Sequence, residues 1–138
     1  MRNVLETLRS LDYFVDNEFL QKYALLVEQN TRTRQINTKT HKHHIIPKSW
    51  YKLCSQEIDN TRSNLVNLPY RTHILAHYYL CLCTEDPFKY ANELAMVCLL
   101  SSPGKNIVDK ALISNLPMYN NIYEDYMYKL KTNFRLYD

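Results

Sequence analysis

His41-Lys42-His43-His44-Ile45-Ile46-Pro47-Lys48-Ser49 opens the most informative part of this 138-residue sequence. Two further stretches follow, Asn64-Leu65-Val66-Asn67-Leu68 and His73-Ile74-Leu75-Ala76-His77, and all five histidines of the chain lie in the first and the third. Histidine binds transition metals as a neutral imidazole and exchanges protons near pH 7. Histidines gathered in this way indicate a metal-dependent hydrolytic site.

The residue pattern around these stretches predicts two short strands and a helix. Residues 43–46 are short and end at Pro47, which is typical of a strand, and residues 65–68 predict a second one. Pro69 is expected to open a helix, because the first amides of a helix have no intrahelical partner to lose. Elsewhere the pattern predicts helices over residues 3–11, 16–28 (with Asp16 or Asn17 as cap), 70–83, 87–100, 106–115 and 118–134, a loop or extended arm over 30–40, and an irregular connection over 49–63.

The predicted elements can place three imidazoles around one ion. Residues four apart share a face of a helix, so His73 and His77 can both bind the same metal. The third ligand has to come from elsewhere, and the strand at His43 and His44 is the plausible donor. Neighbouring strand residues point to different sides, so one of these two can bind metal while the other takes a proton from water.

Composition narrows the class of protein. The chain is 46% apolar, which favours a folded globular domain, and no stretch has the length of a membrane span. Gly104 is the single glycine, which argues against a glycine-rich phosphate loop. Four cysteines without a C-x-x-C pair, and no recognisable secretory signal, favour free thiols in a reducing compartment.

Positive charge is concentrated next to the histidines. Residues 29–56 contain no Asp or Glu, but six cations: Arg32, Arg34, Lys39, Lys42, Lys48 and Lys52. Such a window attracts a polyanion such as a nucleic-acid backbone, although a solvated basic linker has the same composition.

The order of a His-His doublet, an Asn, and a helical H-x-x-x-H resembles the HNH motif, the ββα-metal finger of the His-Me finger nucleases. The resemblance covers residues 42–82, and the steps of nine residues from Asn64 to His73 and four to His77 match the family. It implies that His43, His73 and His77 bind metal and that His44 is the general base. It also implies that Asn64 supports the catalytic loop through backbone hydrogen bonds. One departure is Trp50-Tyr51-Lys52-Leu53, which stands where family members often have glycines.

The resulting expectation is an α+β protein, a ββα-metal finger embedded in a mostly α-helical single domain. N-terminal helices and a basic arm (1–40) would precede the motif (41–84), and a helical extension (85–138) would follow. We expect a cytoplasmic endonuclease in a bacterial host cell, encoded by the bacterium or a phage, that hydrolyses double-stranded DNA with a divalent ion. Mg, Mn, Ni and Zn stay open as the ion, and so does a homodimer. The basic residues closest in sequence to the site, expected to contact phosphates, are Lys42, Lys48 and Arg71. His41 falls outside the motif and is expected to face solvent or to lie near a phosphate.

Two alternatives stay open. A non-catalytic, zinc-stabilised nucleic-acid-binding module would need the metal ligands but no free base, so the presence of His44 favours an enzyme. A nuclease toxin with an immunity partner is the other, and an acidic neighbouring gene product would favour it.

Overall fold

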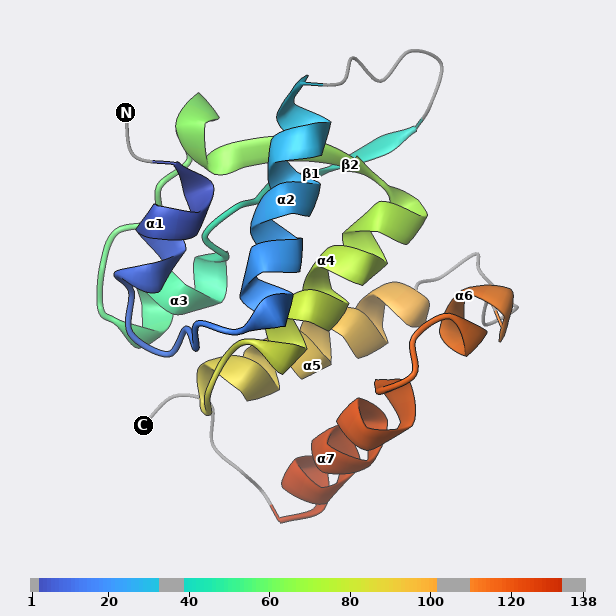
Figure 1. Ribbon diagram of the computed structural model, residues 1–138. Coiled ribbons are helices and arrows are strands. Elements are labelled where there is room, and N and C mark those ends of the chain that lie inside the picture. Colours follow the sequence, from blue (N-terminus) through green and yellow to red (C-terminus); the bar gives the residue numbers. More distant parts are fainter. Residues whose placement is uncertain (1–2, 33–38, 102–109, 133–138) are drawn as a thin grey trace.

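A computed structural model describes residues 3–32, 39–101 and 110–132, and within them the chain has the expected mixed α+β fold (Figure 1). The described residues form seven α-helices, one short 3₁₀ turn and one two-stranded antiparallel sheet. In chain order the elements are α1 (Val4–Arg9), α2 (Glu18–Arg32), β1 (Thr40–His44), α3 (Lys48–Leu53), η1 (Arg62–Asn64), β2 (Leu65–Pro69), α4 (Tyr70–Leu82), α5 (Phe88–Leu100), α6 (Lys110–Ser114) and α7 (Tyr119–Lys131).

The two strands and the helix that follows them are present, with a shift in the first strand. In the antiparallel register His43 pairs with Val66 and His44 with Leu65. The prediction placed the first strand over residues 43–46, but it runs from Thr40 to His44. It ends there because the side-chain amide of Asn64 hydrogen-bonds to both the N–H and the carbonyl of Ile46, which are then not available to a ladder.

Helix α4 lies at the centre of the molecule and is buried on several sides. In Figure 1 it lies between α2 and α5, and β1 and β2 cross one end of it. One of its faces packs into a core shared with α1, α2 and the strands through Ala76 and Leu80. Another packs against α5 and the C-terminal helices through Ile74 and Tyr78. A helix with apolar contacts on two faces is held rigidly, and its remaining side presents His73 and His77.

The connection after the His doublet is partly helical, so the prediction of an irregular segment over 49–63 was wrong for 49–53 and 62–63, and it agrees with the structure over 54–61. Helix α3 begins directly after Pro47, and the η1 turn precedes β2. Trp50 and Tyr51 of α3 are buried against Phe88 and Ala91 of α5, which stabilises this single short helix from outside. Tertiary burial of two large aromatic side chains therefore determines the structure of this segment.

The remaining predicted helices agree with the structure where it describes them, but residues 30–32 of the predicted loop or arm belong to α2. Asn17 caps α2 by accepting hydrogen bonds from the amides of Phe19 and Leu20. The arm predicted over 30–40 overlaps the end of α2 and the start of β1, and residues 33–38 lie outside the described part, as do 102–109 and 133–134 of the predicted tail. The four cysteines all lie in the described part of the chain, and no disulfide bond joins them there. Within the described chain, no helix combines the length and the apolar character needed to cross a membrane.

Candidate metal centre

His43 of β1 meets His73 and His77 of α4, and the three side chains can hold a metal ion. One ring nitrogen from each lies within 4.8 Å of the other two. His43 and His77 are buried, with 3% and 8% of their surface exposed, and His73 is half-buried. The three histidines predicted as metal ligands are therefore gathered at one point, His73 and His77 by their spacing on one helix and His43 by the strand beside it.

All three imidazoles are electrically neutral at physiological pH, which is the form that binds metal. Burial, followed by the proximity of His77 and His73, holds the pKa of His43 well below its usual value. Burial also lowers the pKa of His73 to about 3 and that of His77 to about 4, although the hydrogen bond from His77 to Asn92 acts in the opposite direction. No proton has to leave these rings near pH 7 before an ion binds.

Tyr23 of α2 fixes the ring of His43. Its hydroxyl donates to the carbonyl oxygen of Ile45, at 2.6 Å, and therefore accepts from Nε2–H of His43, at 2.8 Å. The lone pair of His43 is then on Nδ1, which is the nitrogen left for a metal. Neither Tyr23 nor its element was assigned to the site from the sequence.

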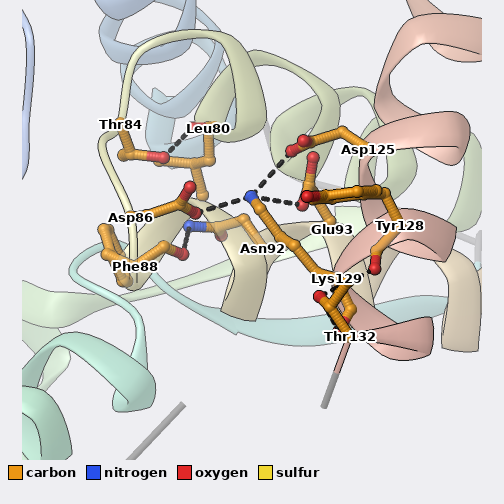
Figure 2. Close-up of polar contacts among 10 residues, drawn as sticks. All are labelled: Leu80, Thr84, Asp86, Phe88, Asn92, Glu93, Asp125, Tyr128, Lys129 and Thr132. Carbon is orange, nitrogen blue, oxygen red and sulfur yellow. Dashed lines mark hydrogen bonds and ion pairs between the residues drawn. The ribbon is translucent and has the colours of Figure 1, made fainter. Parts of the chain in front are cut away.

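Asn92 of α5 fixes the ring of His77 in the same way. Its Nδ2 donates to the carbonyl of Phe88, so its Oδ1 is the atom that faces Nδ1 of His77, at 3.3 Å (Figure 2 shows the bond to Phe88). Nδ1 of His77 then carries the proton and Nε2 the lone pair. Partners of this kind orient metal-binding histidines and select their tautomer.

His41 lies beside this cluster, in contact with His73. It is half-buried, and its Nδ1 lies 3.1 Å from Nδ1 of His73. The expectation that it faces solvent was therefore wrong, and the alternative that it lies near a phosphate stays a prediction. His41 and His43 are two apart on β1 and therefore share the side of the strand that faces α4. The two-residue spacing of His41 and His43 could have indicated this shared side of the strand, but the HNH motif assigns no role to His41.

Asn64 ties the loop that follows the doublet to the start of β2. It is 4% exposed, accepts from the amide of Ile46 at 2.8 Å, and donates to the carbonyls of Ile46 and Asp59 at 3.2 and 2.9 Å. This is the combination of donating and accepting that we expected of an asparagine amide holding the loop. It keeps the end of β1, and with it the doublet, in place beside α4.

His44 is half-buried and turned toward Asn60 rather than the metal ligands. The Nε2 of His44 lies 2.7 Å from Oδ1 of Asn60, which can only accept, so Nε2 carries a proton, and in the neutral form of the ring the lone pair is on Nδ1. A neutral imidazole with one nitrogen held and the other open can remove a proton from water. Asn60 was not assigned to the site from the sequence.

A cavity of about 330 Å³ connects these groups and has lysines around it. The four histidines of the predicted site line it together with three lysines: His43, His44, His73, His77, Lys42, Lys48 and Lys52. Lys48 and Lys52 lie four apart on α3, so they share a face of that helix. The third basic residue predicted to contact phosphate, Arg71, is exposed on α4 and is not among the described residues that line the cavity.

No family model, no curated protein and no solved structure matches this chain. What the cluster does must therefore follow from its own residues and their geometry.

A buried ionic network holds α5, and thereby Asn92, in place. Lys129 of α7 is 5% exposed, and its ammonium group lies 2.6 Å from Asp86, 2.7 Å from Asp125 and 3.1 Å from Glu93 (Figure 2). Glu93 follows Asn92 on α5 and is fully buried, and its second carboxyl oxygen has no hydrogen-bond partner among the described residues. Burial raises the pKa of Glu93 to about 8. The network joins α7 to the helix that orients His77.

Proposed function

We propose that this protein is a metal-dependent endonuclease of the HNH type that hydrolyses phosphodiester bonds of double-stranded DNA. The observation that supports this most is the shared cavity. A three-histidine cluster suited to a metal, a fourth histidine with an open nitrogen, and three lysines all line the same space. Phosphodiester hydrolysis requires charge stabilisation, a base and electrostatic attraction for the substrate. The metal ligands, the fourth histidine and the lysines, respectively, could supply these three functions.

In this proposal His44 is the general base. Its Nδ1 takes a proton from a water molecule whose oxygen attacks phosphorus, and the bond from phosphorus to the 3′ oxygen breaks. The 3′ oxygen leaves and takes up a proton from solvent, so the products carry a 5′-phosphate and a 3′-hydroxyl. Asn60 keeps His44 in the tautomer that this step needs, because it occupies Nε2. When bound, a divalent ion would supply positive charge to the scissile phosphate and to the departing oxygen.

The donor set favours some ions over others. Within the described residues the cluster consists of three neutral imidazoles and no carboxylate. Imidazole suits Zn²⁺ and Ni²⁺, whereas Mg²⁺ prefers carboxylate, carbonyl and water oxygens. We therefore propose that the site binds Zn²⁺ or Ni²⁺. Mn²⁺ should bind more weakly, and Mg²⁺ is the least suited of the four candidate ions.

The lysines are proposed to hold the DNA backbone. Lys42 directly precedes the doublet on β1, and Lys48 and Lys52 line the cavity from α3. A phosphodiester that enters the cavity would meet positive charge before it reaches His44. Contacts of this type position nucleic acid without selecting a sequence.

Nicking of supercoiled plasmid by the pure protein, with each divalent ion added in turn, tests the proposal. His44→Ala should lower the rate by about 10²–10⁴, because a positioned base is lost, and should leave metal affinity unchanged. Asn60→Ala keeps the base and should slow cleavage by less. Asn67→Ala, an exposed change on β2, is the matched control and should cut like the wild type.

Two results would count against the proposal. His44→Ala that nicks at the wild-type rate would remove His44 from the chemistry. A wild-type protein that binds metal and DNA but cuts under no condition would instead support the non-catalytic, metal-stabilised module.

A further inference from the structure

His41 and His73 touch through nitrogens of the same type, which restricts where their protons can be. The two Nδ1 atoms are 3.1 Å apart, and the rings meet edge to face with centroids 5.3 Å apart. A hydrogen bond across this distance needs one N–H and one lone pair. Either His73 donates to His41, or His41 donates to His73.

The two arrangements differ in what they leave for a metal. If His73 donates from Nδ1, its Nε2 has the free lone pair and can bind an ion. If His41 donates instead, Nε2 of His73 carries the proton and cannot bind. In a neutral His73 ring, the direction of the hydrogen bond to His41 therefore decides whether Nε2 is left for an ion.

The ring of His41 is itself held in place. Its strand position pairs with Leu68 of β2, and its ring packs edge to face on Tyr70, with centroids 6.0 Å apart. The hydroxyl of Tyr70 donates to the carbonyl of Leu99 on α5, at 3.0 Å. His41 is therefore held where it can accept a hydrogen bond from His73. Tyr23 and Asn92 are held in the same way beside His43 and His77.

We propose that His41 is a positioning residue of the metal centre, which accepts Nδ1–H of His73 and so keeps Nε2 of His73 available to the ion. This inference rests on the metal site of the proposed function and adds a residue that the HNH resemblance does not assign. It also completes a pattern: each ligand has one supporting partner, and each partner comes from a different element, α2, β1 or α5.

Metal affinity and ring tautomer test the inference without any use of DNA cleavage. Zn²⁺ affinity is measured by competition with a chromophoric chelator for the wild type, His41→Ala, His41→Phe and His41→Gln. Long-range ¹H–¹⁵N NMR of the metal-free proteins reports the tautomer of His73. Phenylalanine keeps the ring packing on Tyr70 but has no acceptor, whereas glutamine keeps an acceptor. Asn67→Ala, an exposed change on β2 outside the cavity, is the control, and His73→Ala shows the loss of a ligand itself.

Loss of a partner of this kind typically weakens metal binding about 10–100-fold. We expect that loss for His41→Ala and His41→Phe, with His73 divided between two tautomers, and a large recovery for His41→Gln. Wild-type Zn²⁺ affinity and an unchanged His73 tautomer in His41→Phe would overturn the inference, even if the protein proves to be a nuclease. A wild type that binds Zn²⁺ in this pattern but fails to nick plasmid would overturn the proposed function and leave His41 in its role. A wild type that binds neither Zn²⁺ nor Ni²⁺ would overturn both.

Discussion

Asn64→Ala should destabilise the protein more than any other single change in the loop between β1 and β2. The side chain is 4% exposed and makes three hydrogen bonds, to the amide and carbonyl of Ile46 and to the carbonyl of Asp59. Each such bond contributes about 0.5–1.5 kcal/mol net, so their joint loss amounts to about 1.5–4.5 kcal/mol. For a chain of this size, that corresponds to a fall in melting temperature of about 5–15 °C.

Thermal unfolding followed by circular dichroism, with a chelator present to exclude metal effects, measures this loss. Asn67→Ala is the matched control, because Asn67 is an exposed asparagine three residues along on β2; a surface change of this kind usually alters stability by less than about 0.5 kcal/mol. Asn64→Asp should be at least as harmful as alanine at pH 7, because a carboxylate cannot donate to the two carbonyls. If Asn64→Ala melts within about a degree of Asn67→Ala, the three bonds do not stabilise the loop and the reasoning fails.

The remaining predictions concern charge and metal. Lys52→Ala in a cleavage-deficient background should lower the slope of log affinity for duplex DNA against log salt by about 0.9, as expected for one phosphate contact, whereas Arg71→Ala should leave it nearly unchanged; equal slopes for both would mean that the cavity does not bind the backbone. The pKa of Glu93 is raised to about 8 in the folded state, so the stability it contributes is complete below its ordinary pKa near 4.5 and is lost as pH rises through 8. Unfolding free energies from pH 5 to 9 should therefore show Glu93→Gln gaining on the wild type toward high pH, and parallel curves would contradict this. His77→Ala removes one of three ligands, so the rise in melting temperature on addition of Zn²⁺ should largely disappear; an unchanged rise would exclude His77 from the site.

The sequence was most informative where local geometry alone sets the arrangement. His73 and His77 share a helix face by their spacing, and a strand with a histidine doublet can supply only a small choice of third ligands. The hydrogen bonds of Asn64 could be expected because an amide both donates and accepts, and loops without glycine need such a link. These inferences required little knowledge of how distant segments pack.

The supporting residues could not be predicted, because tertiary packing brings them to the site. Tyr23 and Asn92 lie 20 and 15 residues from the histidines they contact, in helices whose apolar pattern indicates only burial. The ionic network around Lys129 joins residues up to 43 positions apart and has no local signature. Physical reasoning on the sequence predicts each helix, but not the rotation with which it packs.

Helix α3 could have been predicted from the sequence, because a proline precedes it. Pro47 precedes α3 as Pro69 precedes α4, and the same property of proline was applied only to the second. Once α3 is helical, Lys52 falls on the same face as Lys48, and its place at the cavity follows. The missed helix therefore also explains the missed lysine.

The origin of the three supporting partners in separate elements has a consequence for how the centre assembles during folding. The ligands themselves lie within one short span of chain, from His43 to His77, and contacts that are close in sequence tend to form early. Two of the supports, Tyr23 and Asn92, arrive only when α2 and α5 dock on α4. During refolding in the presence of Zn²⁺, the ion should therefore bind weakly at first and tightly later. The rate of this increase in affinity would measure the rate at which α2 and α5 dock.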